Sequence, residues 1–166
     1  VRLADGRARW RGVRGTGRWL DRWADRGLPT GAPLFVLAYV LGGAALPFAP
    51  RLAARARKLA LVRSRYQEAI PRFLCRKLTR WGTALIFGRA VADLGTRPYW
   101  PAGYAPGAPF RVLMETRPTR YAETLGVVPL SDAELGVGEC LEVAVDHEFA
   151  YRSRKLMTAA VEWLRA

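Results

Sequence analysis

The sequence predicts a mostly α-helical protein with a single transmembrane helix, which continues into a long basic amphipathic helix. A Pro-rich extended segment and a C-terminal amphipathic helix are expected to follow. Residues 27–50 carry no charge, in a chain of which 25% is charged. Apolar residues recur every three or four positions after this stretch and again near the C-terminus, which is the period of an α-helix. The expected segments are an N-terminal arm (1–26), the span (27–50), a long basic helix (51–94), an extended segment (95–130) and a C-terminal helical segment (131–166).

The uncharged stretch reads GLPTGAPLFVLAYVLGGAALPFAP, and its most apolar part is 31–49. A transmembrane helix needs about 20 apolar residues to cross about 30 Å of hydrocarbon. Arginines stand on both sides, and a charge at the centre of such a helix costs about 2.5–3.5 kcal/mol. A buried helix of a soluble protein, or a loop threading a ribosome, is the alternative. The residues expected in the span are Leu34, Phe35, Leu37, Ala38, Tyr39, Leu41 and Gly42.

Basic residues flank the predicted span and are expected to contact lipid headgroups or a partner subunit. Five arginines precede the span within about 20 residues, and six basic residues follow it. The positive-inside rule therefore leaves the orientation open. The expected contact residues are Arg22, Arg26, Arg51, Arg55, Arg57 and Lys58.

The net charge of +13 is unevenly distributed. Residues 1–80 hold 18 basic and 4 acidic side chains, whereas residues 81–166 hold 9 and 10. A basic half suits nucleic-acid phosphates or anionic lipid headgroups. We expect no nucleic-acid partner because no zinc-finger spacing or RNP aromatic pattern is present. A basic mitochondrial ribosomal protein remains the alternative.

The arm at 1–26 contains three tryptophans, Trp10, Trp19 and Trp23. Trp19 and Trp23 share one face if the segment is a short helix. Because tryptophan favours the membrane–water interface, the arm is either an interfacial segment or an extended arm over a neighbouring subunit. The chain starts at Val1, and removal of a presequence is left open.

The segments after the span follow simple local signals. Helix 51–94 is expected to kink at Pro71, where a backbone donor is missing. The Pro-rich segment predicts short strands at 111–114 and 126–128. Ser131 and Glu134 have the spacing of a capping box, after which a helix is expected from about 139 to 165.

No catalytic constellation is evident, so we expect no enzyme, no cofactor and no metal. Cys75 and Cys140 are far apart and are expected to be unpaired thiols in a reducing compartment, with a bridge between them left open. His147 is the only histidine. Its neighbours Asp146 and Glu148 suggest acid–base chemistry, but adjacent residues of a helix do not face each other.

The sequence RGLPTG at 26–31 ends a basic arm, precedes the predicted span, and is followed by an Arg-rich helix containing RSRYQEA at 63–69. This arrangement resembles the GRIM-type accessory subunit of mitochondrial complex I over roughly residues 20–80. The family's acidic residues along the long helix are mostly arginine here. Its Trp-Lys-Val-Gly-Glu-Ser stretch is absent, with RPYWP at 97–101 loosely in its place.

The resemblance implies a non-catalytic, single-pass accessory subunit of a respiratory-chain complex in the mitochondrial inner membrane, most closely NADH:ubiquinone oxidoreductase. It implies contacts with other subunits and with membrane lipids, including cardiolipin, and no redox centre on this chain. An accessory subunit of ATP synthase, cytochrome oxidase or a photosystem is the alternative.

Overall fold

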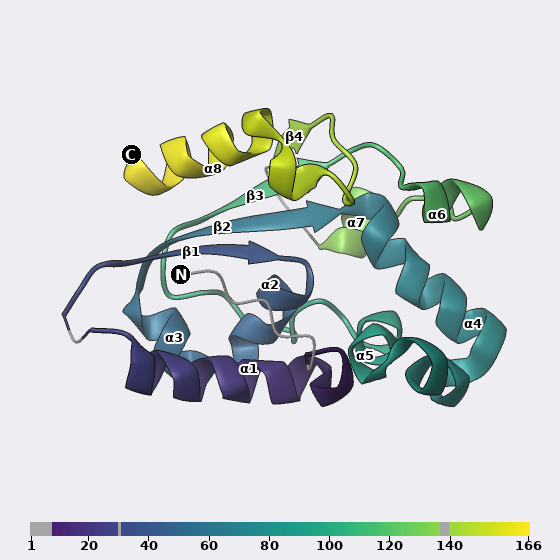
Figure 1. Cartoon of the computed structure of the whole chain (residues 1–166), viewed down its shortest axis with the longest axis horizontal. Helices are drawn as coiled ribbons and strands as arrows, with labels where there is room; N and C mark the ends of the chain where they lie inside the picture. The colour runs from purple at the N-terminus through teal and green to yellow at the C-terminus, as the bar shows by residue number, and fades with distance from the viewer. Residues whose placement is uncertain (1–7, 30, 137–139) are drawn as a thin grey trace.

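The computed structural model describes residues 8–29, 31–136 and 140–166 and shows an α/β fold (Figure 1). At its centre is a parallel four-stranded sheet in the order β1-β2-β3-β4. The inner strands β2 and β3 pair in register, with Leu61 opposite Val112 and Ser64 opposite Glu115. The strands are β1 (Leu34–Tyr39), β2 (Ala56–Ser64), β3 (Phe110–Glu115) and β4 (Cys140–Val143).

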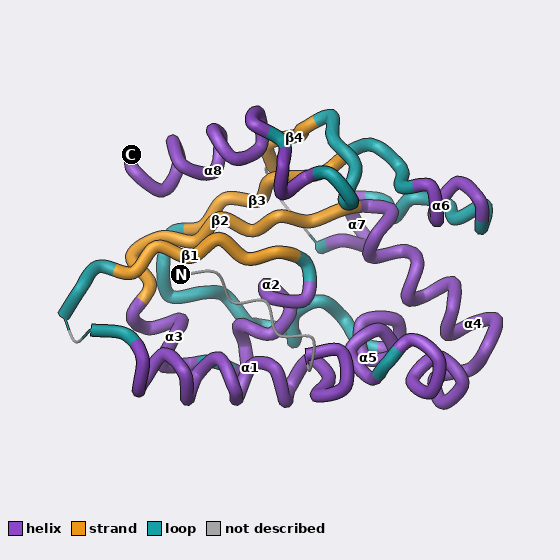
Figure 2. The backbone as a smooth tube through the Cα atoms, in the orientation of Figure 1, coloured by secondary structure: helices purple, strands orange, loops and turns teal. Residues whose placement is uncertain are grey.

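Helices on one face of the sheet connect the strands (Figure 2). The core on this face contains Leu59, Leu61 and Met114 from the sheet, packed against Leu52 and Ala69 from the helices. Parallel strands need such crossover connections, because each strand must start again at the same end. The connections are α2 (Leu41–Ala45), η1 (Leu46–Phe48) and α3 (Pro50–Arg55), then α4 (Arg65–Phe87) and α5 (Arg89–Thr96), and finally α6 (Arg120–Thr124) and α7 (Asp132–Leu135).

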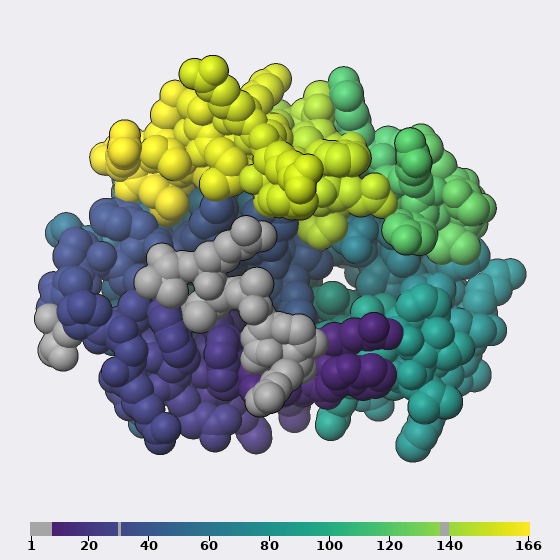
Figure 3. Space-filling view, viewed as in Figure 1, coloured from purple at the N-terminus to yellow at the C-terminus, as the bar shows by residue number. Residues whose placement is uncertain are grey.

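The opposite face of the sheet is covered by α8 (Arg154–Arg165), which follows the short helix η2 (Ala150–Arg152). Leu156 and Ala160 of α8 are fully buried against Val62 and Leu113 of the inner strands. Figure 3 shows these C-terminal residues in yellow on one side of the molecule and the first helix in purple and blue on the other.

Helix α1 (Ala8–Gly27) forms an outer layer against α2, η1, α3 and α5. Gly17 permits this packing, because a Cβ there would lie 2.5 Å from the carbonyl oxygen of Ala45. The N-terminal arm was expected to be either a short helix or an extended segment, and the structure shows a helix from residue 8 onward that is interrupted at Gly12, where φ is +71°. Residues 1–7 lie outside the described part of the chain.

The predicted transmembrane helix is wrong. The seven residues expected in it form strand β1 (Leu34–Tyr39) and the start of α2 (Leu41–Ala45). A strand in a parallel sheet is covered on both faces, so its sequence is as continuously apolar as that of a membrane segment. Among the described helices, none has the length and apolar character required to span a bilayer.

The long basic helix and the C-terminal helix are also wrong as single elements. Residues 51–94 divide into α3, β2, α4 and α5, with a break at Thr79 inside α4, where φ is +61°. Of the helix expected from about 139 to 165, residue 139 lies outside the described residues and 140–143 form strand β4 (Cys140–Val143). Apolar positions three or four apart also occur in a doubly covered strand, which explains the wrong assignment.

Of the other local predictions, the capping box, the first of two short strands and the free thiols are confirmed. The capping box between Ser131 and Glu134 is present at the start of α7. The strand predicted at 111–114 lies within β3, whereas 126–128 forms no strand. Cys75 and Cys140 are free thiols, as expected.

Candidate acid–base site

Polar side chains gather where the strands end, on the face of the sheet that α8 covers. Tyr39 and Glu115 are the last residues of β1 and β3, and His147 follows β4. Side chains two residues apart along a strand share a face, so Glu115 points to the same side as Leu113, which packs in the α8 core. The carboxyl ends of parallel strands are where open α/β sheets bind their ligands.

Glu115 and His147 form a directly bonded pair. Oε2 of Glu115 lies 2.8 Å from Nδ1 of His147. The glutamate side chain is fully buried, whereas the imidazole is 23% exposed. When the Glu115 carboxylate is ionised it only accepts hydrogen bonds, and the contact then requires the proton on Nδ1 of His147 and leaves a lone pair on Nε2. The pair therefore presents a basic nitrogen with a fixed ring orientation.

Tyr39 completes the cluster. Its ring centroid lies 5.7 Å from that of His147. Burial raises the pKa of the Tyr39 phenol well above its usual range, and the nearby charge of Glu115 raises it further. The hydroxyl group therefore remains a neutral hydrogen-bond donor at physiological pH.

Two atoms of this cluster keep unused hydrogen-bonding capacity. Among the described residues, neither the Tyr39 hydroxyl nor Oε1 of Glu115 has a hydrogen-bond partner, although both atoms are buried. Leaving such a group unsatisfied costs about 1–3 kcal/mol. A buried polar atom without a protein partner is explained by an ordered water, a bound ion or a catalytic role.

The loop after β4 is tied to the end of β3, which places His147. The backbone N–H groups of Thr116 and Arg117 donate to the carbonyl oxygens of Val143 and Val145, at 3.2 and 3.3 Å. Oδ1 of Asp146 accepts the N–H of Phe149 at 3.1 Å and closes the next turn. These bonds bring together two residues that are 32 positions apart in the sequence.

A second polar cluster lies on the other face of β2 and is internally satisfied. The guanidinium of Arg63 donates to both carboxylate oxygens of Glu68, at 2.7 and 2.6 Å. Its Cζ lies 3.9 Å from the centroid of the Tyr99 ring, and the Tyr99 hydroxyl donates to the carbonyl oxygen of Val40 at 2.9 Å. Burial raises the pKa of Tyr99, with the Glu68 charge adding to the shift and Arg63 opposing it. We assign this cluster a structural role, because its groups already bind one another.

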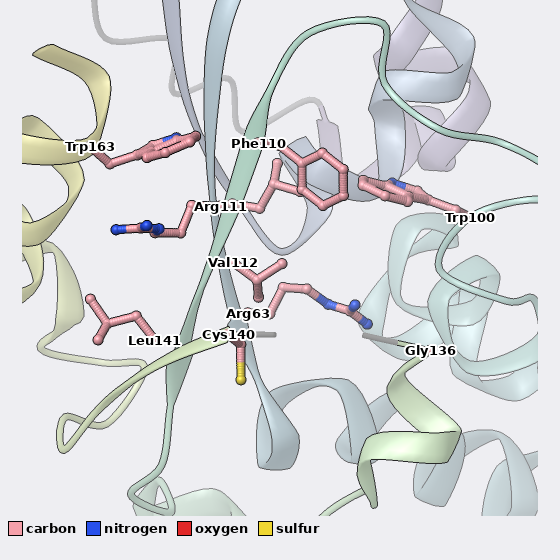
Figure 4. A pocket seen from close by; sticks show the side chains of 10 residues that line it. Arg63, Trp100, Phe110, Arg111, Val112, Gly136, Cys140, Leu141 and Trp163 are labelled. Carbon is pink, nitrogen blue, oxygen red and sulfur yellow. The ribbon is translucent and has the colours of Figure 1, made fainter. Parts of the chain in front are cut away.

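A cavity of about 450 Å³ opens along the edge of β3, at the end opposite Glu115 (Figure 4). Arg111 and Trp163 lie on one side of the strand, and Phe110 and Trp100 on the other. Cζ of Arg111 is 4.6 Å from the Trp163 ring centroid, so these two side chains bind each other. Burial raises the pKa of the Cys140 thiol at the cavity wall, which disfavours the nucleophilic thiolate.

The basic residues predicted to contact lipid or a partner lie on α1, α3 and β2. Arg51 pairs with Asp25 at 2.8 Å, and Arg55 donates to the carbonyl oxygens of Ala24 and Pro29. The ammonium of Lys58 lies 4.8 Å from the Trp163 ring centroid. Arg22, Arg26 and Arg57 are exposed. Their role towards lipid or a partner stays a prediction.

Sequence reasoning noted His147 but missed Glu115 as its partner. The position of Glu115 in the sequence could have identified it, because it immediately follows the strand predicted at 111–114 and so lies at the carboxyl end of that strand. The adjacent acids Asp146 and Glu148 drew attention instead. Within residues 8–29, 31–136 and 140–166, no three His, Cys, Asp or Glu residues are grouped to hold a metal ion.

Comparison with known proteins gives no relative for this chain. No protein family, no curated protein and no solved structure matches it.

Proposed function

We propose that this chain is an acid–base catalyst in which Nε2 of His147 removes a proton from a hydroxyl group or a water molecule that attacks an ester. The observation that carries the proposal is the 2.8 Å contact between buried Glu115 and Nδ1 of His147. Imidazole exchanges protons near neutral pH, which makes histidine the commonest general acid–base group.

Each member of the cluster has a distinct role in this proposal. His147 is the catalytic residue, because it is the partly exposed member of the pair and its Nε2 is not the atom that binds Glu115. Glu115 is a positioning residue, which holds the tautomer and stabilises the imidazolium formed on proton uptake. Tyr39 packs against the ring and limits its rotation.

The sequence-based expectation of a non-catalytic accessory subunit of complex I stays a prediction. So do its partners, its mitochondrial location and the absence of enzymatic activity. The chief support for the accessory subunit was the span, and the residues expected to form it are a strand and a short helix. The acid–base proposal instead rests on a contact between named side chains.

The test measures hydrolysis of chromogenic carboxylic and phosphate esters by the full chain and three variants. We expect His147→Gln to lower the rate by about 10²–10⁴-fold, the usual contribution of a positioned general base. Glu115→Gln should also lower it, because an amide can donate to Nδ1 and select the wrong tautomer. Arg22→Gln, on the exposed surface of α1, is the control and should leave the rate unchanged.

The same rate in His147→Gln and in the original chain would refute the proposal. Hydrolysis no faster than that of buffer across both ester classes would also count against it. Nitrogen NMR of the single histidine provides an independent check, because the proposal requires the proton on Nδ1 and a free lone pair on Nε2.

A further inference from the structure

Helix α4 changes direction near its end. Thr79 has φ of +61°, and its Oγ1 accepts the N–H of Gly82 at 3.4 Å, as at the start of a new helix. The Thr83 hydroxyl donates to the carbonyl oxygen of Thr79 at 2.8 Å. The last eight residues of α4 therefore form a separate, well-capped helical piece that ends at Gly88, where φ is +97°.

This last piece exposes large apolar side chains. Trp81 is 83% exposed and Leu85 is 73% exposed, one helical turn apart. Single exposed apolar residues are ordinary, but several large ones exposed on one short piece of helix indicate a binding surface. We call this surface the α4 tip and define it by Leu78, Trp81, Leu85, Ile86 and Phe87 of α4 with Trp10 of α1, all of which are exposed.

The α4 tip is held in place by α1. The guanidinium of Arg9 donates to the carbonyl oxygens of Phe87 and Ile86, at 2.7 and 2.6 Å. These bonds satisfy carbonyl groups at the helix end and bring the neighbouring Trp10 to the same region of the surface. Figure 1 shows the start of α1 beside α5, where α4 turns back. The apolar side chains are thus presented by an anchored element.

The exposed charges around the α4 tip, in the part of the chain that the structure describes, are basic. Between Glu68 and Asp93 the sequence has no acidic residue. Arg76, Lys77 and Arg89 are exposed beside the apolar side chains. Arg80, the first residue of the last piece, pairs with Asp93 at 3.1 Å and remains half exposed. The surface therefore combines apolar side chains with a rim whose exposed charge is basic.

We propose that the α4 tip inserts into the headgroup region of an anionic membrane, as a peripheral anchor. Tryptophan, phenylalanine and leucine next to lysine and arginine are the composition of helices that lie in the interface. The basic rim complements anionic headgroups, and a zwitterionic surface offers it no net attraction. The proposal is independent of the acid–base site, which lies at the carboxyl end of the strands, near the start of α4 and not at its tip.

The experiment is flotation of the full chain with vesicles of phosphatidylcholine alone or with about 30% phosphatidylglycerol. We expect binding to the anionic vesicles and at least tenfold weaker binding to the neutral ones. Raising the salt concentration should weaken binding to the anionic vesicles, because the basic side chains are exposed. The double variant Trp81→Ala with Leu85→Ala should reduce the partition coefficient at least tenfold.

The matched control replaces two exposed side chains elsewhere, Tyr121→Ala with Val128→Ala. This variant should bind anionic vesicles like the original chain. No binding to anionic vesicles would overturn the proposal. Equal losses in the two double variants would also overturn it, because the effect would then not be specific to the α4 tip. Concentration-dependent self-association that the α4 variant abolishes, without vesicle binding, would instead identify an interface between copies.

Discussion

Removing the carboxylate of Glu68 should destabilise the fold far more than removing an exposed acid. Glu68 binds Arg63 through two hydrogen bonds, and both side chains are over 90% buried. The variant Glu68→Ala leaves the guanidinium buried without a counter-charge. The loss of one partner of such a pair typically costs about 3–5 kcal/mol.

The matched control is Asp25→Ala. Asp25 also pairs with an arginine, Arg51, at 2.8 Å, but both side chains are more than half exposed. Exposed pairs contribute about 0–1 kcal/mol. The two variants thus remove the same kind of interaction at similar distances and differ mainly in burial.

The assay is urea unfolding followed by circular dichroism, supported by thermal melting. For a chain of 166 residues, 3–5 kcal/mol corresponds to a fall in Tm of about 6–20 °C. The double variant Arg63→Met with Glu68→Leu should recover part of the loss, because no charge is left buried. A cost below about 1 kcal/mol for Glu68→Ala, equal to that of the control, would refute the argument.

Three further predictions concern single groups. Ser131→Ala should cost about 0.5–2 kcal/mol through loss of the capping box, measured by urea unfolding. The hydrogen bonds of Ser131 lower the pKa of Glu134. They therefore contribute stability at pH values above the ordinary carboxyl pKa, and this contribution is lost as the pH falls. The Ser131→Ala variant should therefore lose stability less steeply than the original chain as the pH falls below about 4.5. Equal slopes of stability against pH in the two proteins would contradict this. Leu61→Ala, in the fully buried centre of β2, should cost about 2–5 kcal/mol, and a loss under 1 kcal/mol would contradict the packing. Tyr39 has a raised pKa, so it contributes stability that is present below pH 10 and decreases above it. Tyr39→Phe should reduce the alkaline loss in unfolding measured from pH 8 to 11, to which buried Tyr99 also contributes, and an unchanged pH profile would count against the burial of the Tyr39 phenol.

The fold class could not be predicted from the uncharged stretch alone. Its apolar residues are equally compatible with a membrane helix and with a strand covered on both faces. The pairing with β2, which is remote from the stretch's own pattern, makes it a strand. The β2 sequence itself resembles a helix because Leu59 and Val62 are three apart. Local signals were more reliable: the capping box at Ser131 and the strand ahead of Glu115 depend on neighbouring residues only.

The candidate site illustrates a limit of a different kind. His147 is visible in the sequence as the single histidine, but the carboxylate that orients it is 32 residues away. Only the parallel order of β3 and β4 brings the two together. The nearer acid, Asp146, binds the backbone N–H of Phe149 instead. The carboxylate nearest to His147 in the sequence is therefore not the one that binds it.

The uneven charge of the chain has a structural explanation that bears on the membrane proposal. The described acids of the first 80 residues are each used within the fold. Asp21 accepts backbone N–H groups at the start of α3, and Asp25 and Glu68 pair with arginines. These acids are engaged with Arg51, Arg63 and backbone N–H groups, and the other exposed arginines of α1 and the end of α4 set the surface charge. An excess of positive charge that served only solubility could be distributed anywhere on the protein surface. Here exposed basic residues surround the α4 tip, the surface that also exposes Trp81 and Leu85, so one anionic, partly apolar partner would satisfy both features.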